Sequence, residues 1–139
     1  MRYRAAIRFA VEGDIRFISH HDTMRLFERA IARSGLPVRF SEGFNPRPRL
    51  SLPLPRAVGV ASRADVLVIE LSEPIPPDQV LSQLSPQMPG GLQLLSACPL
   101  EGSASLQPAA VVYELPLAAD QTAGIGGRIS DLLSAPQWV

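Results

Sequence analysis

The first twelve residues alternate in polarity at every second position, and this is the strongest constraint on the fold. One side of the segment carries Tyr3, Ala5, Ile7, Phe9 and Val11. The other side carries Arg2, Arg4 and Arg8. A period of two with apolar residues on one side is typical of a half-buried β-strand, whose second face is here basic. The rest of the chain must supply elements that cover the apolar face.

Residues 19–35 change to the period of an α-helix. Ser19 is a suitable N-cap, Asp22 lies where a negative charge suits the helix dipole, and Gly35 follows the last turn. The apolar stripe consists of Met24, Phe27, Ala30 and Ile31. Another face carries His21, Arg25, Arg29 and Arg33. The pattern predicts a well-capped helix with one buried and one basic face.

The following segments complete a recognisable order. Short strands are predicted at 36–40 and 49–54, a covered strand at 64–71, a helix from Pro77 to Ser85 and a strand at 92–98. This is the order of a ferredoxin-like βαββαβ fold of the α+β class, in which two helices cover one face of an antiparallel sheet. We expect this domain to span residues 1–100.

The remainder of the chain starts a second unit. Residues 101–107 are small and patternless, which is typical of a linker. Residues 109–117 alternate as a strand would, and a helix with Ile125, Ile129 and Leu132 on one side follows. We therefore expect an incomplete β-α unit over 108–139. It is either a truncated second repeat or a pair of elements that pack back on the first domain.

The formal charge is zero because two unlike halves cancel. Residues 1–63 hold twelve of the 13 Lys and Arg residues, all of them arginine, against five acids, a net +7; residues 64–139 are at −7. Such asymmetry suggests a lobe that favours a polyanion.

Composition also limits the chemistry of the chain. One cysteine, Cys98, provides neither an iron–sulfur cluster nor a structural zinc site, so we expect no metal and no cofactor in this chain. No apolar stretch reaches the roughly 18 to 20 residues of a membrane span, and Arg8 interrupts the N-terminal one. We expect a cytoplasmic protein without a membrane partner.

Three clusters could carry function. His20 and Asp22 open the helix and could form a general acid/base pair or simply a capped helix start. Arg25 and Arg29 could bind phosphates or form a solvated helical face with weak local ion pairs. Both questions stay open from sequence alone.

The third cluster is SEGFNPRPRL, residues 41–50. Gly43, Asn45, Pro46 and Pro48 favour a stiff turn that loses little entropy on binding. Phe44 could stack on a base or a partner, or fill the core, and Arg47 and Arg49 should project to one side of an extended backbone.

Two ordered motifs give the chain a family resemblance. IRFISHHDTMRLFERAIARSGLP, then SEGFNPRPRLSLPLP, and later ADVLVIEL resemble the radical SAM-linked domain of unknown function, a bacterial family found fused to or encoded beside radical SAM proteins, often near translation genes. The resemblance covers about residues 2–73. Family-motif positions are Ser19, His20, Asp22, Arg25, Arg29, Ala30, Ser41, Gly43, Phe44, Asn45, Pro46, Pro48, Pro53, Leu54 and Pro55.

The resemblance implies a role beside a radical SAM protein, which would supply the iron–sulfur cluster and SAM. We expect a non-catalytic accessory domain that presents or binds RNA or a ribosomal component. The expected binding residues are His20, Asp22, Arg25, Arg29, Ser41, Gly43, Phe44, Asn45, Pro46, Arg47, Pro48 and Arg49. Two alternatives remain: an adaptor that docks the radical SAM enzyme without nucleic acid, and an RNA-processing enzyme that uses His20 with Asp22 or with an arginine. We predict that the segment 43–48 meets the start of the helix, with Asn45 or Arg47 near the helix N-terminus. The single-site hypothesis fails if the two segments lie apart.

Overall fold

The computed structural model describes residues 2–135 and divides the chain into two units, Met1–Pro108 and Ala109–Val139. The first unit contains a four-stranded antiparallel sheet in the order β2-β3-β1-β4. The strands are β1 (Tyr3–Val11), β2 (Leu50–Ser51), β3 (Ser62–Leu71) and β4 (Leu92–Pro99). The α+β class is confirmed, and the sheet is compatible with a ferredoxin-like fold.

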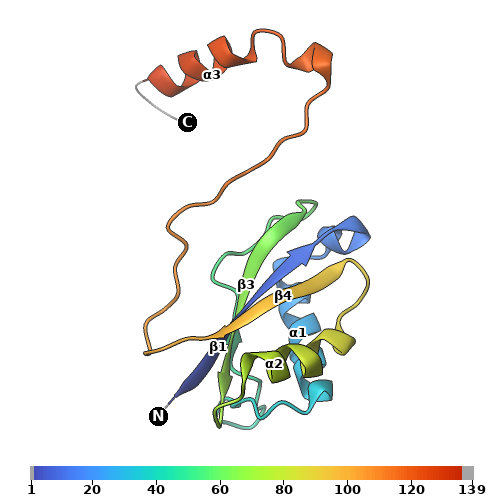
Figure 1. The fold of residues 1–139 in the computed structure, drawn as a ribbon, viewed down its shortest axis with the longest axis vertical. Helices are drawn as coiled ribbons and strands as arrows, with labels where there is room; N and C mark the ends of the chain where they lie inside the picture. Colours follow the sequence, from blue (N-terminus) through green and yellow to red (C-terminus); the bar gives the residue numbers. More distant parts are fainter. Residues whose placement is uncertain (1, 136–139) are drawn as a thin grey trace. The chain divides into compact units, whose positions relative to one another are not determined.

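Two helices, α1 (His20–Ser34) and α2 (Pro77–Leu84), cover one face of this sheet (Figure 1). Short 3-10 turns, η1 (Gly13–Phe17) and η2 (Ser85–Gln87), precede α1 and follow α2. The predicted caps of α1 are confirmed: the Ser19 side chain accepts a hydrogen bond from the Asp22 backbone N–H, and Gly35 has a left-handed φ of 75°.

The core forms between the apolar side of β1 and the two helices. Ile7 and Phe9 of β1, Phe27 of α1 and Leu84 of α2 are at most 1% exposed. The rings of Phe9 and Phe27 meet edge to face with centroids 5.0 Å apart. The alternation at the start of the sequence therefore predicted correctly which side of β1 is buried.

The two short strands predicted after α1 are largely wrong. At 36–40 there are two isolated bridges, Val38 to Leu71 and Phe40 to Pro48, and the segment 49–54 pairs only as β2. Prolines that lack the N–H needed for a ladder punctuate this region, which explains why the pairing stays short.

The second unit is described by itself. Residues 109–118 form no strand in the part of the chain that the structure describes, although their apolar side chains alternate. The predicted helix is present as α3 (Ile125–Ser134), after the turn η3 (Ala119–Gln121). An alternating sequence becomes a strand only where a partner supplies the ladder hydrogen bonds.

Candidate functional site

The motif at 41–50 forms a hairpin-like loop that is closed at its base. The Ser41 N–H donates to the Arg47 carbonyl over 2.8 Å, and the Arg47 N–H donates to the Ser41 hydroxyl oxygen over 3.0 Å. Further from the tip of the loop, the Arg49 N–H donates to the Arg39 carbonyl over 2.7 Å. These bonds and the fixed φ angles of Pro46 and Pro48 stiffen the loop.

Phe44 lies at the tip of this loop and is fully exposed, with a relative accessibility of 106%. The interpretation of Phe44 as a core residue is therefore wrong. Gly43, with φ of 126°, allows the chain to turn just before the ring. Asn45 and Arg47, which follow Phe44 in the sequence, are also exposed. The tip thus presents one aromatic ring among polar side chains.

The base of the loop is attached to the edge of β3. The Arg39 N–H donates to the Glu70 carbonyl over 2.8 Å, and the Glu70 N–H donates to the Arg49 carbonyl over 3.0 Å. The Arg49 guanidinium lies 3.8 Å from the Glu70 carboxylate. Arg49 therefore belongs to the attachment of the loop, whereas Arg47 stays at the surface.

At the start of α1, His20 and Asp22 face different surroundings. Asp22 accepts a hydrogen bond from the Ser19 hydroxyl over 3.0 Å and lines a groove along the helix. His20 lines a small hollow beneath the segment 52–56, together with Asp65 of β3. The two side chains thus line different hollows, and no hydrogen bond joins them within residues 2–135.

Sequence reasoning missed a buried ion pair beside His20. Arg56 and Asp65 lie 3.9 Å apart, with side chains 8% and 10% exposed. The Arg56 guanidinium also donates to the carbonyls of Arg16 (2.7 Å) and Val60 (2.8 Å). The signal was Asp65, one of two acids in the otherwise apolar run ADVLVIEL, because an acid that is buried requires a partner.

Burial raises the pKa of the Asp65 carboxyl group above its ordinary value of 3.8. The Ser62 hydrogen bond and the Arg56 charge both lower that pKa but do not cancel the effect of burial. Arg56 thus fastens the segment after β2 to the turn before α1, and Asp65 is the counter-charge that makes its burial tolerable.

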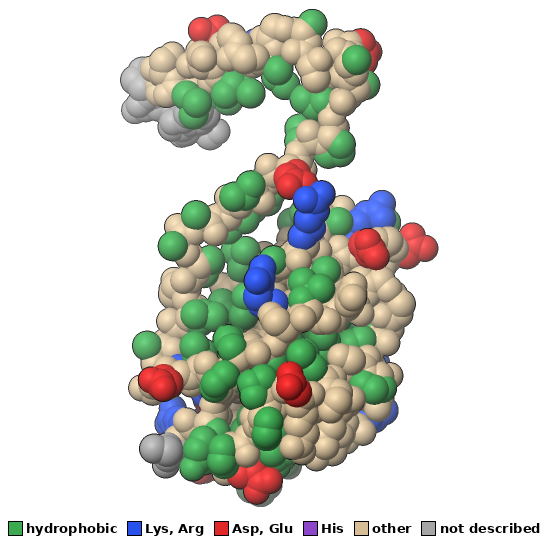
Figure 2. All heavy atoms as spheres, viewed as in Figure 1, with side chains coloured by type: hydrophobic (Ala, Val, Ile, Leu, Met, Phe, Trp, Pro, Cys, Tyr) green, Lys and Arg blue, Asp and Glu red, His purple; other side chains and the backbone are tan. Residues whose placement is uncertain are grey.

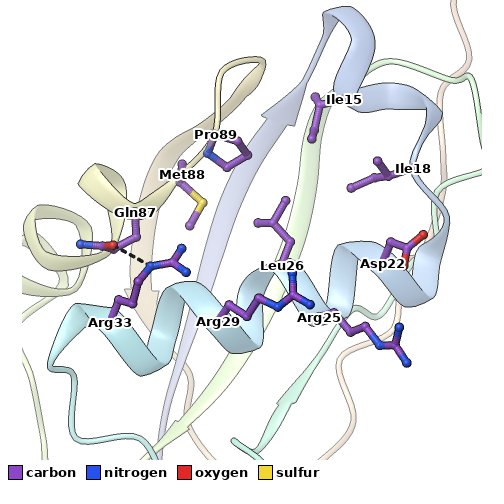
Figure 3. A pocket seen from close by; sticks show the side chains of 10 residues that line it. All are labelled: Ile15, Ile18, Asp22, Arg25, Leu26, Arg29, Arg33, Gln87, Met88 and Pro89. Atoms are coloured by element: carbon purple, nitrogen blue, oxygen red, sulfur yellow. Dashed lines mark hydrogen bonds between the residues drawn. The ribbon is translucent and has the colours of Figure 1, made fainter.

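A groove of about 580 Å³ runs along the other side of α1 (Figure 3). Arg25, Arg29 and Arg33 follow one another along it, and Arg33 donates to the Gln87 side-chain oxygen over 3.1 Å. Apolar side chains from the turn before α1 and from residues 88–89 complete its lining. The structure thus places Asp22, Arg25 and Arg29 along one groove, whereas His20 lines the separate hollow beside Asp65.

The loop tip and the start of α1 do not meet in the structure. The loop is attached at Glu70, which pairs with Arg4 on β1, whereas the neighbour of His20 is Asp65, which pairs with Phe9. Five residues along a strand separate these positions by about 17 Å. The expectation of a single site is corrected to two surfaces: the loop 41–48 and the α1 groove.

Two other arginines of the first half, Arg4 and Arg16, make contacts of their own. Arg4 is tied by hydrogen bonds to the carbonyls of Ala104 and Glu101, and the Arg16 guanidinium lies 4.3 Å from the centre of the Phe17 ring. On the face that Figure 2 shows, basic side chains of the first unit are scattered among hydrophobic ones. The charge asymmetry is thus distributed over several parts of the fold.

Two further observations concern metal-ligand side chains and membrane-spanning helices. Residues 2–135 contain no group of three or more His, Cys, Asp or Glu side chains arranged to hold a metal ion. Within the same range, none of the helices combines the length and the apolar character that crossing a membrane requires.

Comparison with known proteins gives one assignment. The family model described as "Uncharacterized protein conserved in bacteria (DUF2344)" matches residues 2–139. Nothing matches among the curated proteins or among the solved structures. The match covers both surfaces described above, and the chain therefore belongs to this bacterial family, DUF2344.

Proposed function

We propose that this chain is a non-catalytic accessory domain of a radical SAM system and that it holds an RNA or ribosome-related substrate at the loop 41–48. The observation that carries the proposal is the fully exposed ring of Phe44 at the tip of a stiffened loop. Burying a Phe side chain is worth about 1.5–3 kcal/mol, so a ring exposed at the tip of an ordered loop can contribute that much to the binding of a ligand.

The chemistry of the tip suits an unpaired nucleotide. A base stacked on an aromatic side chain contributes about 1–3 kcal/mol, and any base can stack because each has a π-face. Arg47, three residues further on, supplies a guanidinium group for a phosphate, and the Asn45 amide can both donate and accept hydrogen bonds. Because the loop is already ordered, binding costs little additional conformational entropy.

The motif resemblance supports the link to a radical SAM protein. SHHD with RLFERA, followed by SEGFNPRP, is the motif order of the radical SAM-linked domains. In this proposal, the partner protein carries the iron–sulfur cluster and SAM, and this chain positions the substrate. The substrate then reaches the partner's chemistry while it is held on the loop.

Binding of a short fluorescein-labelled single-stranded RNA, followed by fluorescence anisotropy at several salt concentrations, tests the proposal. Phe44→Ala should weaken binding by about tenfold, from the stacking energy of one base, whereas Phe44→Trp should retain it. Arg47→Ala should reduce the salt slope by about 0.7, the contribution of one phosphate contact to a single strand.

The matched controls are Leu95→Ala, another exposed apolar side chain, and Arg8→Ala, an exposed arginine on β1. Both should bind like the unchanged protein. No binding of RNA at low salt, or equal affinity of the Phe44→Ala variant and the unchanged protein, would show that the proposal is wrong.

A further inference from the structure

The groove along α1 combines an apolar floor with a row of arginines, and the proposed function does not use it. We infer that this groove is a docking site for an amphipathic α-helix of a partner protein, a helix with an apolar face and an acidic edge. The inference rests on the groove alone and does not depend on RNA binding at the loop.

The spacing of the arginines fits a helix that lies alongside α1. Arg25, Arg29 and Arg33 recur every four residues, so their Cα atoms are successively offset by about 6 Å along the helix axis. Acidic side chains four residues apart on a second helix have the same offset. Two neighbouring helices can therefore form a ladder of ion pairs without distorting either backbone.

Two of these arginines have no partner among the residues that the structure describes. Neither Arg25 nor Arg29 forms a hydrogen bond or an ion pair with another of the residues 2–135. Arg33, in contrast, is oriented by its hydrogen bond to Gln87 (Figure 3). The groove therefore presents uncompensated positive charge, and the complementary ligand is an anion.

The floor of the groove selects a protein over a nucleic acid. Ile15, Ile18, Leu26, Met88 and Pro89 line it, and all five are partly buried apolar side chains. None of the residues lining the groove is aromatic, so a nucleobase has no ring to stack on. An apolar helical face can instead bury itself there, and the flexible Met88 side chain can adapt to it.

The length and polarity of the groove define the ligand further. Its α1 lining runs from Asp22 to Arg33, about 17 Å along the axis, which corresponds to three turns of a partner helix. Asp22 at one end would repel an acidic side chain there. The acidic edge should therefore lie opposite Arg25 to Arg33, with a neutral or basic residue opposite Asp22.

Site-specific photo-crosslinking in the intact protein in bacterial cells tests the inference. Benzoylphenylalanine is placed at Pro89, in the lining of the groove. It should crosslink to a protein segment that has apolar residues at helical spacing and Asp or Glu at every fourth position. The same group at Leu95 on β4 serves as the control position and should not crosslink to this segment.

Charge reversal decides whether the arginines hold the partner. Arg25→Glu with Arg29→Glu should reduce the crosslink at least tenfold, whereas the matched pair Arg2→Glu with Arg8→Glu should leave it unchanged. A synthetic peptide of the crosslinked segment should show the same loss of affinity. Arginine in place of its acidic residues should restore binding to the charge-reversed protein, a rescue that a folding defect would not allow.

Several outcomes would overturn the inference: no crosslink at Pro89, a nuclease-sensitive RNA adduct, a segment without an acidic helical edge, or a crosslink that survives the reversal. Phe44→Ala should leave the groove crosslink intact. A failure at the groove can therefore be told apart from a failure of RNA binding at the loop.

Discussion

At the scale of single residues, the structure buries an ion pair, Arg56 with Asp65. Arg56 is buried, and it bonds the carbonyls of Arg16 and Val60 while it faces Asp65. A buried guanidinium is tolerated only when its charge and its donors are satisfied. Arg56 therefore fixes the loop over His20 and does not contribute to a binding surface.

Removing this guanidinium should be costly. Arg56→Met keeps most of the apolar volume but leaves Asp65 buried without a counter-charge, and we expect a loss of about 3 kcal/mol in the free energy of unfolding. Chemical denaturation followed by circular dichroism measures this difference in the free energy of unfolding. Arg8→Met, at an exposed site, should change little. A loss below about 1 kcal/mol would mean that the pair is solvated.

The raised pKa of Asp65 predicts the sign of a pH effect. Because the folded protein holds this proton more tightly than the unfolded chain, the contribution is fully present below the ordinary value of 3.8 and is lost as pH rises through the folded-state pKa. The unfolding free energy of the unchanged protein, relative to Asp65→Asn, should therefore fall with increasing pH. A rise would show that the attraction to Arg56 outweighs burial.

At the scale of elements, close contacts fix how the strands and turns join. Gly91 lies immediately before β4, where its carbonyl accepts a hydrogen bond from the Glu12 N–H over 2.8 Å. Its φ of 86° is unfavourable for any residue with a side chain. A Cβ atom there would overlap the Glu12 carbonyl oxygen and the Ile15 side chain.

Two adjacent glycines provide a matched test of this junction. Gly91→Ala should destabilise the protein by about 2 kcal/mol or more, because it adds steric overlap to an unfavourable φ. Gly90→Ala meets no atom within 4 Å and has no positive φ, so it should be nearly neutral. Thermal unfolding of both variants decides the point, and similar midpoints would contradict the predicted close approach at Gly91.

The elements differ in how well the sequence predicted them, and the difference has a physical cause. β1 and α1 were predicted nearly to the residue because each buries one continuous face and so carries a clear period. The segments 36–40 and 49–54 pair only over a few residues, since they share one edge of β3 and contain prolines. Local composition could not determine how that edge is divided between them.

At the scale of the whole molecule, the buried core residues among residues 2–135 all lie in the first unit. The buried core residues lie between Ala5 and Leu92, and the partly buried ones packed on them extend to Ala97. In the second unit, Ile129, Leu132 and Leu133 of α3 are exposed, with Leu133 at 70%. The stability of the sheet should therefore not depend on residues after Pro108.

A shortened chain tests this division. Residues 1–108 should unfold cooperatively, with a midpoint close to that of the full chain, because every element of the sheet and its covering helices is retained. Thermal unfolding by circular dichroism provides the comparison. A fall of more than about 4 °C, equivalent to roughly 1 kcal/mol for a domain of this size, would show that the second unit stabilises the first.

The sequence by itself determined the α+β class, the buried face of β1, both ends of α1 and the stiffness of the loop around Phe44. These properties depend on neighbours a few residues apart, which periodicity, capping and turn chemistry report directly. Only the tertiary structure decided that the loop and the start of α1 lie apart, that Asp65 faces Arg56, and that residues 88–89 complete the groove beside Arg29. These contacts depend on strand register and on chain connections that bring distant segments together, and no local pattern encodes them.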